Sequence, residues 1–376
     1  MTTALPSSRL SGQPGDFVAS LTPTSWVYFL CNVGDGDSQV ILLPEDSNNN
    51  RAAIIVDSFT PKATRLVTSL STAAVLPGGR DLPLVVVTHP HRDHMSNIPR
   101  LFRDHGDRIG EFWDPGYFHP IPAYTATMKE IERRGATISY AQPTAGLRRW
   151  IHGVLVTVLS PAVGLRNRFD TYGTEINDSS ISLRMEYPVT ANQTRDENGR
   201  LTTKNDPASS IILGADAQTN SWSHVMVDFP YLPASTTDAA KAIAAARRST
   251  DLLRANVFKV SHHGSKRGIN LELLERISAS IILVSSREPG GGSHNFPHSL
   301  AQEIIREVKE PRATQAHPSP RRDDWDHRIF YTWDVDDTGT DLGSIAVVFD
   351  GASRTVWRFN DSRGDRIQLD NARQWQ

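Results

Sequence analysis

Short apolar runs separated by polar turns begin at Trp26 and continue to the end of the chain. Runs rich in β-branched and aromatic residues predict strands over 26–32, 39–43, 52–56, 83–87, 154–159, 181–187, 210–213, 257–260, 281–284, 344–349 and 355–359. Stretches with helical spacing predict helices over 61–71, 94–103, 123–134 and 299–308. The chain therefore alternates strands and helices in two halves.

This order of elements predicts an α/β fold in which two mixed β-sheets pack together and helices cover their outer faces. No Pro/Gly-rich linker divides the chain, so one domain is expected over about 24–360, preceded by a flexible lead (1–23) and followed by a polar tail (361–376). A polar stretch at 190–207 reads as an exposed hairpin insertion. A second insertion is expected at about 218–254, with an Ala-rich helix over 237–248.

Composition and charge describe an ordinary globular protein. The 376 residues are 38% hydrophobic and 22% charged, with a formal net charge of −2. A net charge this close to zero provides no general basic field, so it does not support nucleic-acid binding except through a local patch. The single cysteine, Cys31, cannot form an internal disulfide, so nothing requires an oxidising compartment.

The first residues lack the charged-then-apolar layout of a signal peptide. No apolar run approaches the roughly 18 residues of a membrane helix. We therefore expect a cytoplasmic protein with no membrane partner; its oligomeric state is left open.

The strongest chemical signal follows the apolar run 83–87, which reads as a strand buried on both faces. His89, His91, Asp93 and His94 come directly after it. Imidazole and carboxylate groups are the usual ligands of zinc and similar divalent ions. His89 and His91 alternate on the loop and are expected to face one point, and Asp93 and His94 a neighbouring one. The pattern therefore predicts two adjacent metal pockets.

Two later strands end in residues of the same chemistry. The run 211–215 is followed by Asp216, and the run 257–261 is followed by His262 and His263. Each feature alone is weak, since an aspartate after a strand is usually a turn residue or a helix cap. Beside the first motif, a carboxylate at Asp216 could bridge two cations.

These motifs together resemble the metallo-β-lactamase superfamily, and within it the soluble metallo-hydrolase domain of DNA-uptake competence channels (ComEC-type). The matching segments are 32–38 (NVGDGDS), 55–57 (IVD), 88–94 (THPHRDH), 213–216 (LGAD) and 259–265 (KVSHHGS), with weaker matches at 297–298 and 330–332. The resemblance implies a four-layer αββα sandwich and two divalent metal ions, zinc first and manganese as the alternative.

The resemblance also implies roles. His89 and His91 would bind the first metal, and Asp216 would bridge. Asp93, His94 and one histidine of the pair would bind the second; His262, the first residue past the strand, is favoured narrowly over His263.

One family position departs from the pattern. Many members carry a further histidine on the loop before the strand that precedes the bridging aspartate, whereas this chain has Asn177 and Asp178 there. Either residue would have to stand in, with His152 as a weaker substitute, so the first metal is expected to bind weakly or to be a harder ion. Asp57 is expected to orient the metal loop rather than bind metal, and Asp37 is a further candidate for either role.

The expected function is hydrolysis, most of all of a phosphodiester, because the resembled domain is nuclease-like. Two cations that share a water lower its pKa, Asp93 or Asp216 could accept the proton, and His263 or His298 could assist the leaving group. Lys266 could contact a phosphate. The alternatives are a small-molecule esterase or lactonase and a metal-bound binding protein without turnover.

Overall fold

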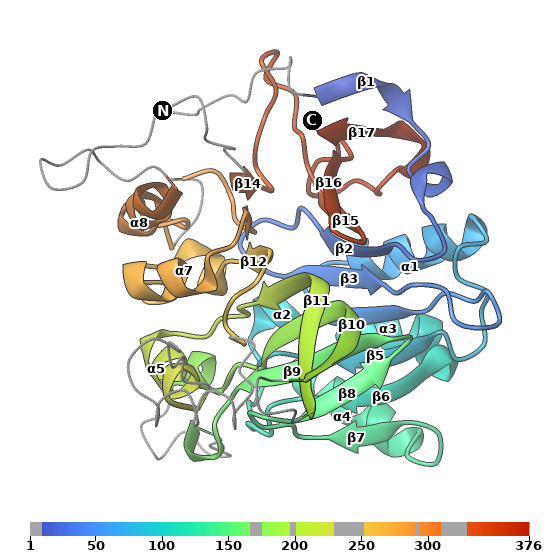
Figure 1. Ribbon diagram of the computed structural model, residues 1–376. Coiled ribbons are helices and arrows are strands. Elements are labelled where there is room, and N and C mark those ends of the chain that lie inside the picture. The colour runs from blue at the N-terminus through green and yellow to red at the C-terminus, as the bar shows by residue number, and fades with distance from the viewer. Residues whose placement is uncertain are drawn as a thin grey trace, which may run out of the picture.

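The computed structural model describes residues 10–165, 175–195, 201–228, 252–289, 294–309 and 329–375 (Figure 1). Within these ranges the chain forms two mixed β-sheets with helices on their outer faces. This is the predicted fold class, an αββα sandwich.

The larger sheet contains both ends of the described chain. Its strand order is β1 (Leu10–Gly15), β17 (Ala372–Trp375), β16 (Ser353–Arg358), β15 (Ile345–Asp350), β2 (Trp26–Leu30), β3 (Ser38–Leu42), β4 (Ala53–Ser58), β5 (Leu82–Val86), β6 (Ile109–Trp113) and β7 (Ser139–Ala141). Pairs from β1 to β4 are antiparallel, and those from β4 to β7 are parallel.

The smaller sheet follows the same plan. Its order is β14 (Ile329–Tyr331), β13 (Ile281–Val284), β12 (Val257–Lys259), β11 (Leu201–Leu213), β10 (Ser182–Arg195), β9 (Val154–Ser160) and β8 (Arg148–Ile151). Strands β11 to β14 are parallel, and β8 to β11 are antiparallel. Each sheet therefore has a parallel half, whose strands all end at the same edge.

Successive side chains along a strand alternate between the core that separates the two sheets and the core under a helix layer. In β2, Trp26 and Tyr28 belong to the core between the sheets, whereas Val27 and Phe29 belong to the core beneath the first helix layer. In β13, Ile281 and Ile282 divide in the same way between the inner core and the second helix layer. Because successive side chains of a strand point to opposite faces, an apolar run without polar interruptions serves two cores at once.

Helices cover both outer faces. The first layer packs on the larger sheet and contains α1 (Lys62–Thr72), α3 (Ile98–His105) and α4 (Pro122–Arg133). The second packs on the smaller sheet and contains α5 (Thr219–Asp228), α7 (Leu271–Ile277) and α8 (Ser299–Lys309), which lie together on the left in Figure 1. In the described part of the chain, none of the helices has the length and apolar character needed to cross a bilayer.

The helix predicted over 94–103 is divided into α2 (Arg92–Met95) and α3. The carbonyl of Asp93 accepts a hydrogen bond from Asp37 N, and Asn97 N donates to the Ser58 carbonyl. The helical bond between positions 93 and 97 is therefore replaced by two bonds to neighbouring loops, which tie the motif after β5 to two other segments.

In the segment expected to be a hairpin insertion, at 190–207, β10 and β11 stay paired as far as Arg195 and Leu201. The second insertion is described only in part. It begins with α5, while residues 229–251, including the Ala-rich helix expected at 237–248, lie outside the described residues.

The folded unit extends beyond the expected boundaries at 24 and 360. Strand β1 lies within the segment expected to be a flexible lead, and it pairs with β17 from the expected tail. The buried carboxylate of Asp361 accepts hydrogen bonds from Ser344 N (2.6 Å) and Ser344 Oγ (2.7 Å) and forms an ion pair with Lys62 (2.5 Å). These buried contacts hold the first residue of the expected tail in the fold. The polar composition of residues 361–376 gave no sign of them. Residues 1–9 lie outside the described residues.

We predict that Asp361→Ala destabilises the protein strongly. The Lys62 side chain is 2% exposed and would lose its carboxylate partner. Breaking a buried pair on one side typically costs about 3–5 kcal/mol. Urea unfolding measures this loss. The control is Glu303→Ala, which removes the exposed partner of Arg306 and should leave the unfolding midpoint almost unchanged. Equal small effects from both variants would contradict the assigned role of Asp361.

Candidate metal centre

The candidate residues meet where the parallel strands of both sheets end. The loop after β5 carries His89 to His94, and the turn after β11 carries Asp216. The short helix η6 (Ser261–Gly264), directly after β12, carries His262 and His263. The carboxyl ends of parallel strands are a common position for sites in α/β proteins, because loops from several strands converge there.

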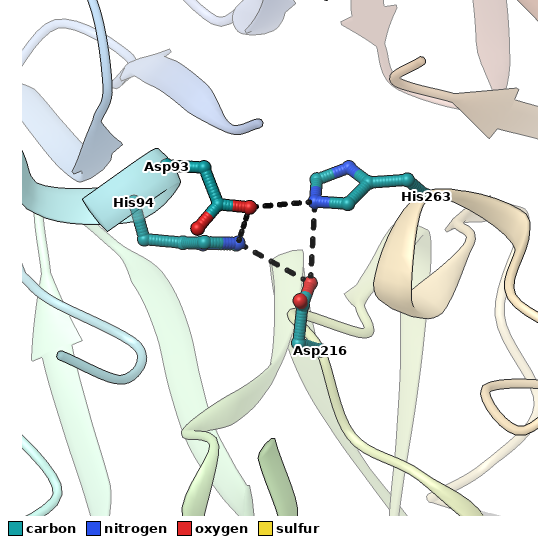
Figure 2. Close-up of side chains that lie close together, drawn as sticks. All are labelled: Asp93, His94, Asp216 and His263. Atoms are coloured by element: carbon teal, nitrogen blue, oxygen red, sulfur yellow. Dashed lines mark ion pairs between the residues drawn. The ribbon is translucent and has the colours of Figure 1, made fainter. Parts of the chain in front are cut away.

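Four of these side chains form one compact cluster (Figure 2). Asp93, His94, Asp216 and His263 offer ligand atoms that all lie within 4.8 Å of one another. His94 Nε2 lies 3.3 Å from Asp216 Oδ1, and His263 Nε2 lies 3.7 Å from the same oxygen. His263 Nε2 is also 3.6 Å from Asp93 Oδ2. Two imidazoles and two carboxylates thus point at one another from three separate segments.

The remaining histidines approach the other oxygen of Asp216. His89 Nε2 and His262 Nε2 each lie 3.7 Å from Asp216 Oδ2. His91 adjoins His89, with 3.0 Å between His89 Nε2 and His91 Nδ1. The structure therefore brings four imidazoles and Asp93 around the Asp216 carboxylate, with His91 beside His89.

The residues present fit divalent cations. His94 Nε2, His263 Nε2 and Asp216 Oδ1 are buried, and among the described residues no partner satisfies them with a hydrogen bond of normal geometry. Unsatisfied buried polar atoms are costly, and natural proteins rarely keep them without a ligand or an ion. Nitrogen and carboxylate donors of this kind are those that zinc and related ions prefer.

Asp57 at the end of β4 fixes the metal loop from behind. Its two oxygens accept hydrogen bonds from Thr88 N and Thr88 Oγ1, each at 2.8 Å. Asp57 Oδ2 also lies 2.8 Å from His94 Nδ1. Because a carboxylate can only accept, this contact places a hydrogen on Nδ1 and directs Nε2 of His94 toward the cluster. This geometry matches the orienting role expected for Asp57.

A second support holds His263. Its Nδ1 lies 3.0 Å from the Ser285 carbonyl, which again requires the hydrogen on Nδ1 and turns Nε2 toward Asp216. Ser285 Oγ donates to the Gly36 carbonyl at 2.7 Å. A side chain at Gly36 would come within 2.7 Å of the Asp93 carbonyl, so only glycine allows this turn to pack against the metal loop.

Asp37 lies beneath the same histidine as part of a buried ion pair with Lys259. Both side chains are fully buried, and Asp37 Oδ1 is 3.9 Å from His263 Nδ1. Asp37 therefore lies next to the same Nδ1 atom of His263 that the Ser285 carbonyl holds. Lys259 and Ser285 were not singled out in the sequence, because a lysine within a strand and a backbone carbonyl give no local signal.

The two halves of the site differ in electrostatics. Burial, reinforced by neighbouring histidines, holds the pKa of His89 well below its usual value and lowers that of His91 to about 4. Burial also lowers the pKa of His94 and His263, but Asp216 and the other nearby carboxylates outweigh it and raise both values. Burial raises the pKa of Asp216, but His94, His262 and His263 outweigh it and hold the value well below normal.

The structure places His263, rather than the favoured His262, in the cluster with Asp93 and His94. Both residues have positive φ angles, 48° and 53°, so the chain turns sharply and the two rings reach Asp216 by different routes. The sequence could not separate two adjacent histidines because this turn sets their directions.

Of the three residues proposed to replace the missing family histidine, Asp178 and His152 make contacts elsewhere. Asp178 accepts hydrogen bonds from Ser221 N and Ser221 Oγ at the start of α5. His152 Nδ1 lies 3.3 Å from the Pro44 carbonyl, at a β-turn between β8 and β9. Asn177 alone reaches the site, with Nδ2 3.4 Å from His262 Nε2.

The two candidate substrate residues, His298 and Lys266, have different surroundings. His298 Nδ1 accepts a hydrogen bond from Leu300 N at the start of α8, so this ring caps a helix. Lys266 is exposed and follows η6 by two residues.

Two rings that were not predicted lie next to the histidines. The ring centroid of His119 is 5.8 Å from that of His91, and the ring centroid of Phe296 is 5.1 Å from that of His262.

Comparison with known proteins finds only distant structural similarity. No protein-family model matches the chain, and no curated protein matches it. Among solved structures, the chain is similar to the metallo-β-lactamase fold protein YhfI from Bacillus subtilis, with 11% identity and a TM-score of 0.37 over 76% of this chain and 92% of that one. A diphosphatase from the PhnP family gives 10% identity and a TM-score of 0.35, over 82% of this chain and 95% of that one.

A long-form RNase Z from yeast gives 10% identity and a TM-score of 0.36, with 73% of this chain covering 40% of that one. Identities and TM-scores this low say nothing of substrate or activity. The two mixed sheets with their outer helices form an αββα sandwich.

Proposed function

We propose that this protein is a metal-dependent hydrolase with two adjacent divalent cations, and that it cleaves phosphodiesters. His89, His91, Asp93, His94, Asp216 and the histidine pair would hold the cations, with zinc favoured by the number of imidazoles. Bound cations of this kind supply Lewis acidity at a phosphoryl or acyl centre and lower the pKa of water.

The observation that carries the proposal is the position of Asp216. Each of its two oxygens is approached by two imidazole nitrogens, at 3.3–3.7 Å. A carboxylate with one oxygen toward each of two nitrogen clusters is suited to bridging two cations. Its side chain is 2% exposed, so its charge is screened little by solvent.

Asp93 is the residue we assign to proton transfer. Its side chain is 36% exposed, whereas the other members of the cluster are buried, so it faces the open side of the site. Burial raises its pKa, but the adjacent His94 and His263 outweigh that effect and hold the value below normal. An ionised carboxylate at the entrance can accept a proton from an attacking water. His263, whose Nδ1 is held by Ser285, is assigned to binding metal instead of assisting the leaving group.

A phosphodiester is the favoured substrate because the resembled competence-channel domain is nuclease-like and Lys266 extends from the loop that carries the histidine pair. Arg267 pairs with Glu175 at 3.6 Å, so its charge is partly matched. Lys266 is therefore the cation that we assign to a substrate phosphate oxygen. A local contact of this kind does not depend on the net charge of the whole protein.

The proposal is tested by counting bound metals and assaying two substrates. Zinc, manganese and iron are measured per chain, and cleavage of bis(4-nitrophenyl) phosphate is compared with that of 4-nitrophenyl acetate, with and without chelator. About two ions and chelator-sensitive cleavage of the diester are expected. Cleavage of the ester alone would indicate an esterase or lactonase, and bound metal without either activity would indicate a binding protein.

We predict that His91→Ala lowers the kcat of the diesterase reaction by about a hundred- to a thousandfold. His91 would hold a cation that stabilises developing charge, and removing one such stabilising group typically costs that much. His105→Ala is the matched control. This histidine lies at the end of α3 beside Thr68 and outside the cluster, so its loss should change kcat by less than about twofold. Equal losses from both variants would refute the location of the site.

A second prediction concerns pH. His94 and His263 have raised pKa values in the metal-free protein, so a cation must displace their protons, whereas His89 and His91 are already neutral near pH 7. Metal affinity should therefore rise with pH until the raised pKa values are passed, by about tenfold per pH unit for each proton displaced. Calorimetry in buffers of different ionisation heat measures the protons released. Affinity that does not change between pH 6 and pH 8 would contradict this assignment.

A further inference from the structure

We infer that His262 is a ligand of the first metal, together with His89 and His91, and replaces the histidine that the resembled family carries on the loop occupied here by Asn177 and Asp178. The inference rests on the proposed two-metal site. It divides the adjacent histidines 262 and 263 between two cations.

The four histidines around Asp216 fall into two pairs, according to which carboxylate oxygen each one approaches. His94 and His263 approach Oδ1, whereas His89 and His262 approach Oδ2. The cluster of ligand atoms within 4.8 Å of one another contains His263 and excludes His262. His262 therefore shares an oxygen with the histidine expected at the first metal, and lies outside the group that defines the second.

The backbone explains how two neighbours can serve two sites. His262 N donates to the Ala215 carbonyl at 2.8 Å, which ties the turn directly to the residue before Asp216. Both histidines then adopt left-handed conformations, and their ring planes differ by 74°. Residues held in this sparsely populated backbone region cluster at functional sites.

The surroundings orient the His262 ring toward the carboxylate. Phe296 packs against it in an edge-on arrangement, with centroids 5.1 Å apart. A side chain at Gly268 would come within 2.8 Å of the Ser261 carbonyl and 3.2 Å of His262 Cβ, so glycine allows the loop to close beneath the ring. With its Nδ2 3.4 Å from His262 Nε2, Asn177 lies beside this ring.

This assignment changes the chemistry expected at the first metal. Three imidazoles and one carboxylate oxygen form a nitrogen-rich set, which suits zinc or cobalt better than manganese. The second set, with His94, His263, Asp93 and Asp216, has equal numbers of nitrogen and oxygen donors. The first metal is therefore not expected to be the weak, hard-ion position that the missing family histidine suggested.

The test measures metal binding in variants, independently of activity. His262→Asn removes the imidazole, and asparagine tolerates a positive φ angle. His152→Asn is the matched control, because His152 has the same φ of 48° and its Nδ1 lies 3.3 Å from the Pro44 carbonyl, at a turn outside the site. We expect about two zinc ions per chain in the wild type and the control, and about one in His262→Asn after dialysis. Near-ultraviolet circular dichroism and thermal unfolding confirm that each variant is folded, and His262→Gly, which relieves the strained φ, repeats the count.

Double variants identify which ion is lost. If His262 and His91 bind the same ion, the His262→Asn/His91→Ala variant should still hold about one ion, because the two changes remove one site. The His262→Asn/Asp93→Ala variant should hold none. Two ions retained in His262→Asn with affinity within about twofold of the wild type would overturn the inference. The reverse pattern of the double variants would assign His262 to the second metal and would also overturn it.

The metal counts separate this inference from the proposed function. A wild type that binds two ions but cleaves neither test substrate would refute hydrolysis, while the counts would still decide the role of His262. A wild type that binds no zinc, manganese or cobalt would refute both.

Discussion

The buried carboxylate of Asp216 has four imidazole nitrogens within 3.7 Å, where the parallel strands of both sheets end. Taking so many polar atoms out of water is unfavourable unless they pair with one another or with cations. The surrounding elements therefore have to hold each ring in one orientation. The loops after β5, β11 and β12 can be understood as the means of satisfying that requirement.

Orientation comes from groups that never face the proposed cations. The Asp57 carboxylate and the Ser285 carbonyl each fix a hydrogen on the Nδ1 atom of one histidine, which leaves Nε2 directed inward. Lys259 and Asp37 add a buried pair beneath this layer. Such supports are expected to matter for metal affinity almost as much as the ligands themselves, because they remove alternative ring orientations.

The sandwich makes these contacts possible by joining segments that are distant in sequence. Asp37 and Lys259 are 222 positions apart, and Asp361 reaches Lys62 across 299 positions. Asp37 also contacts His263 of the site, whereas Asp361 holds the residues after β16 to the start of α1.

Local sequence patterns predicted most of the strands and the helices α1, α3, α4 and α8, and they identified the candidate ligands. Buried parallel strands carry continuous apolar runs, and ligands follow them directly, so both signals are local. Strands β6, β7, β8 and β14 were not predicted, because each has only three to five residues and gives a weak local pattern. The pairing of β1 with β17 was not predicted because the two strands lie at opposite ends of the chain.

Only the folded chain sets which histidine approaches which oxygen of Asp216. A histidine pair contains no information about which ring turns where, since two left-handed residues and the contacts of Phe296, Ser285 and Ala215 set those directions. The same holds for the split of the helix at Asn97 and for the burial of Asp361. In each case the determining partner is a backbone or side-chain group from another segment, and only the folded chain brings it within hydrogen-bonding distance.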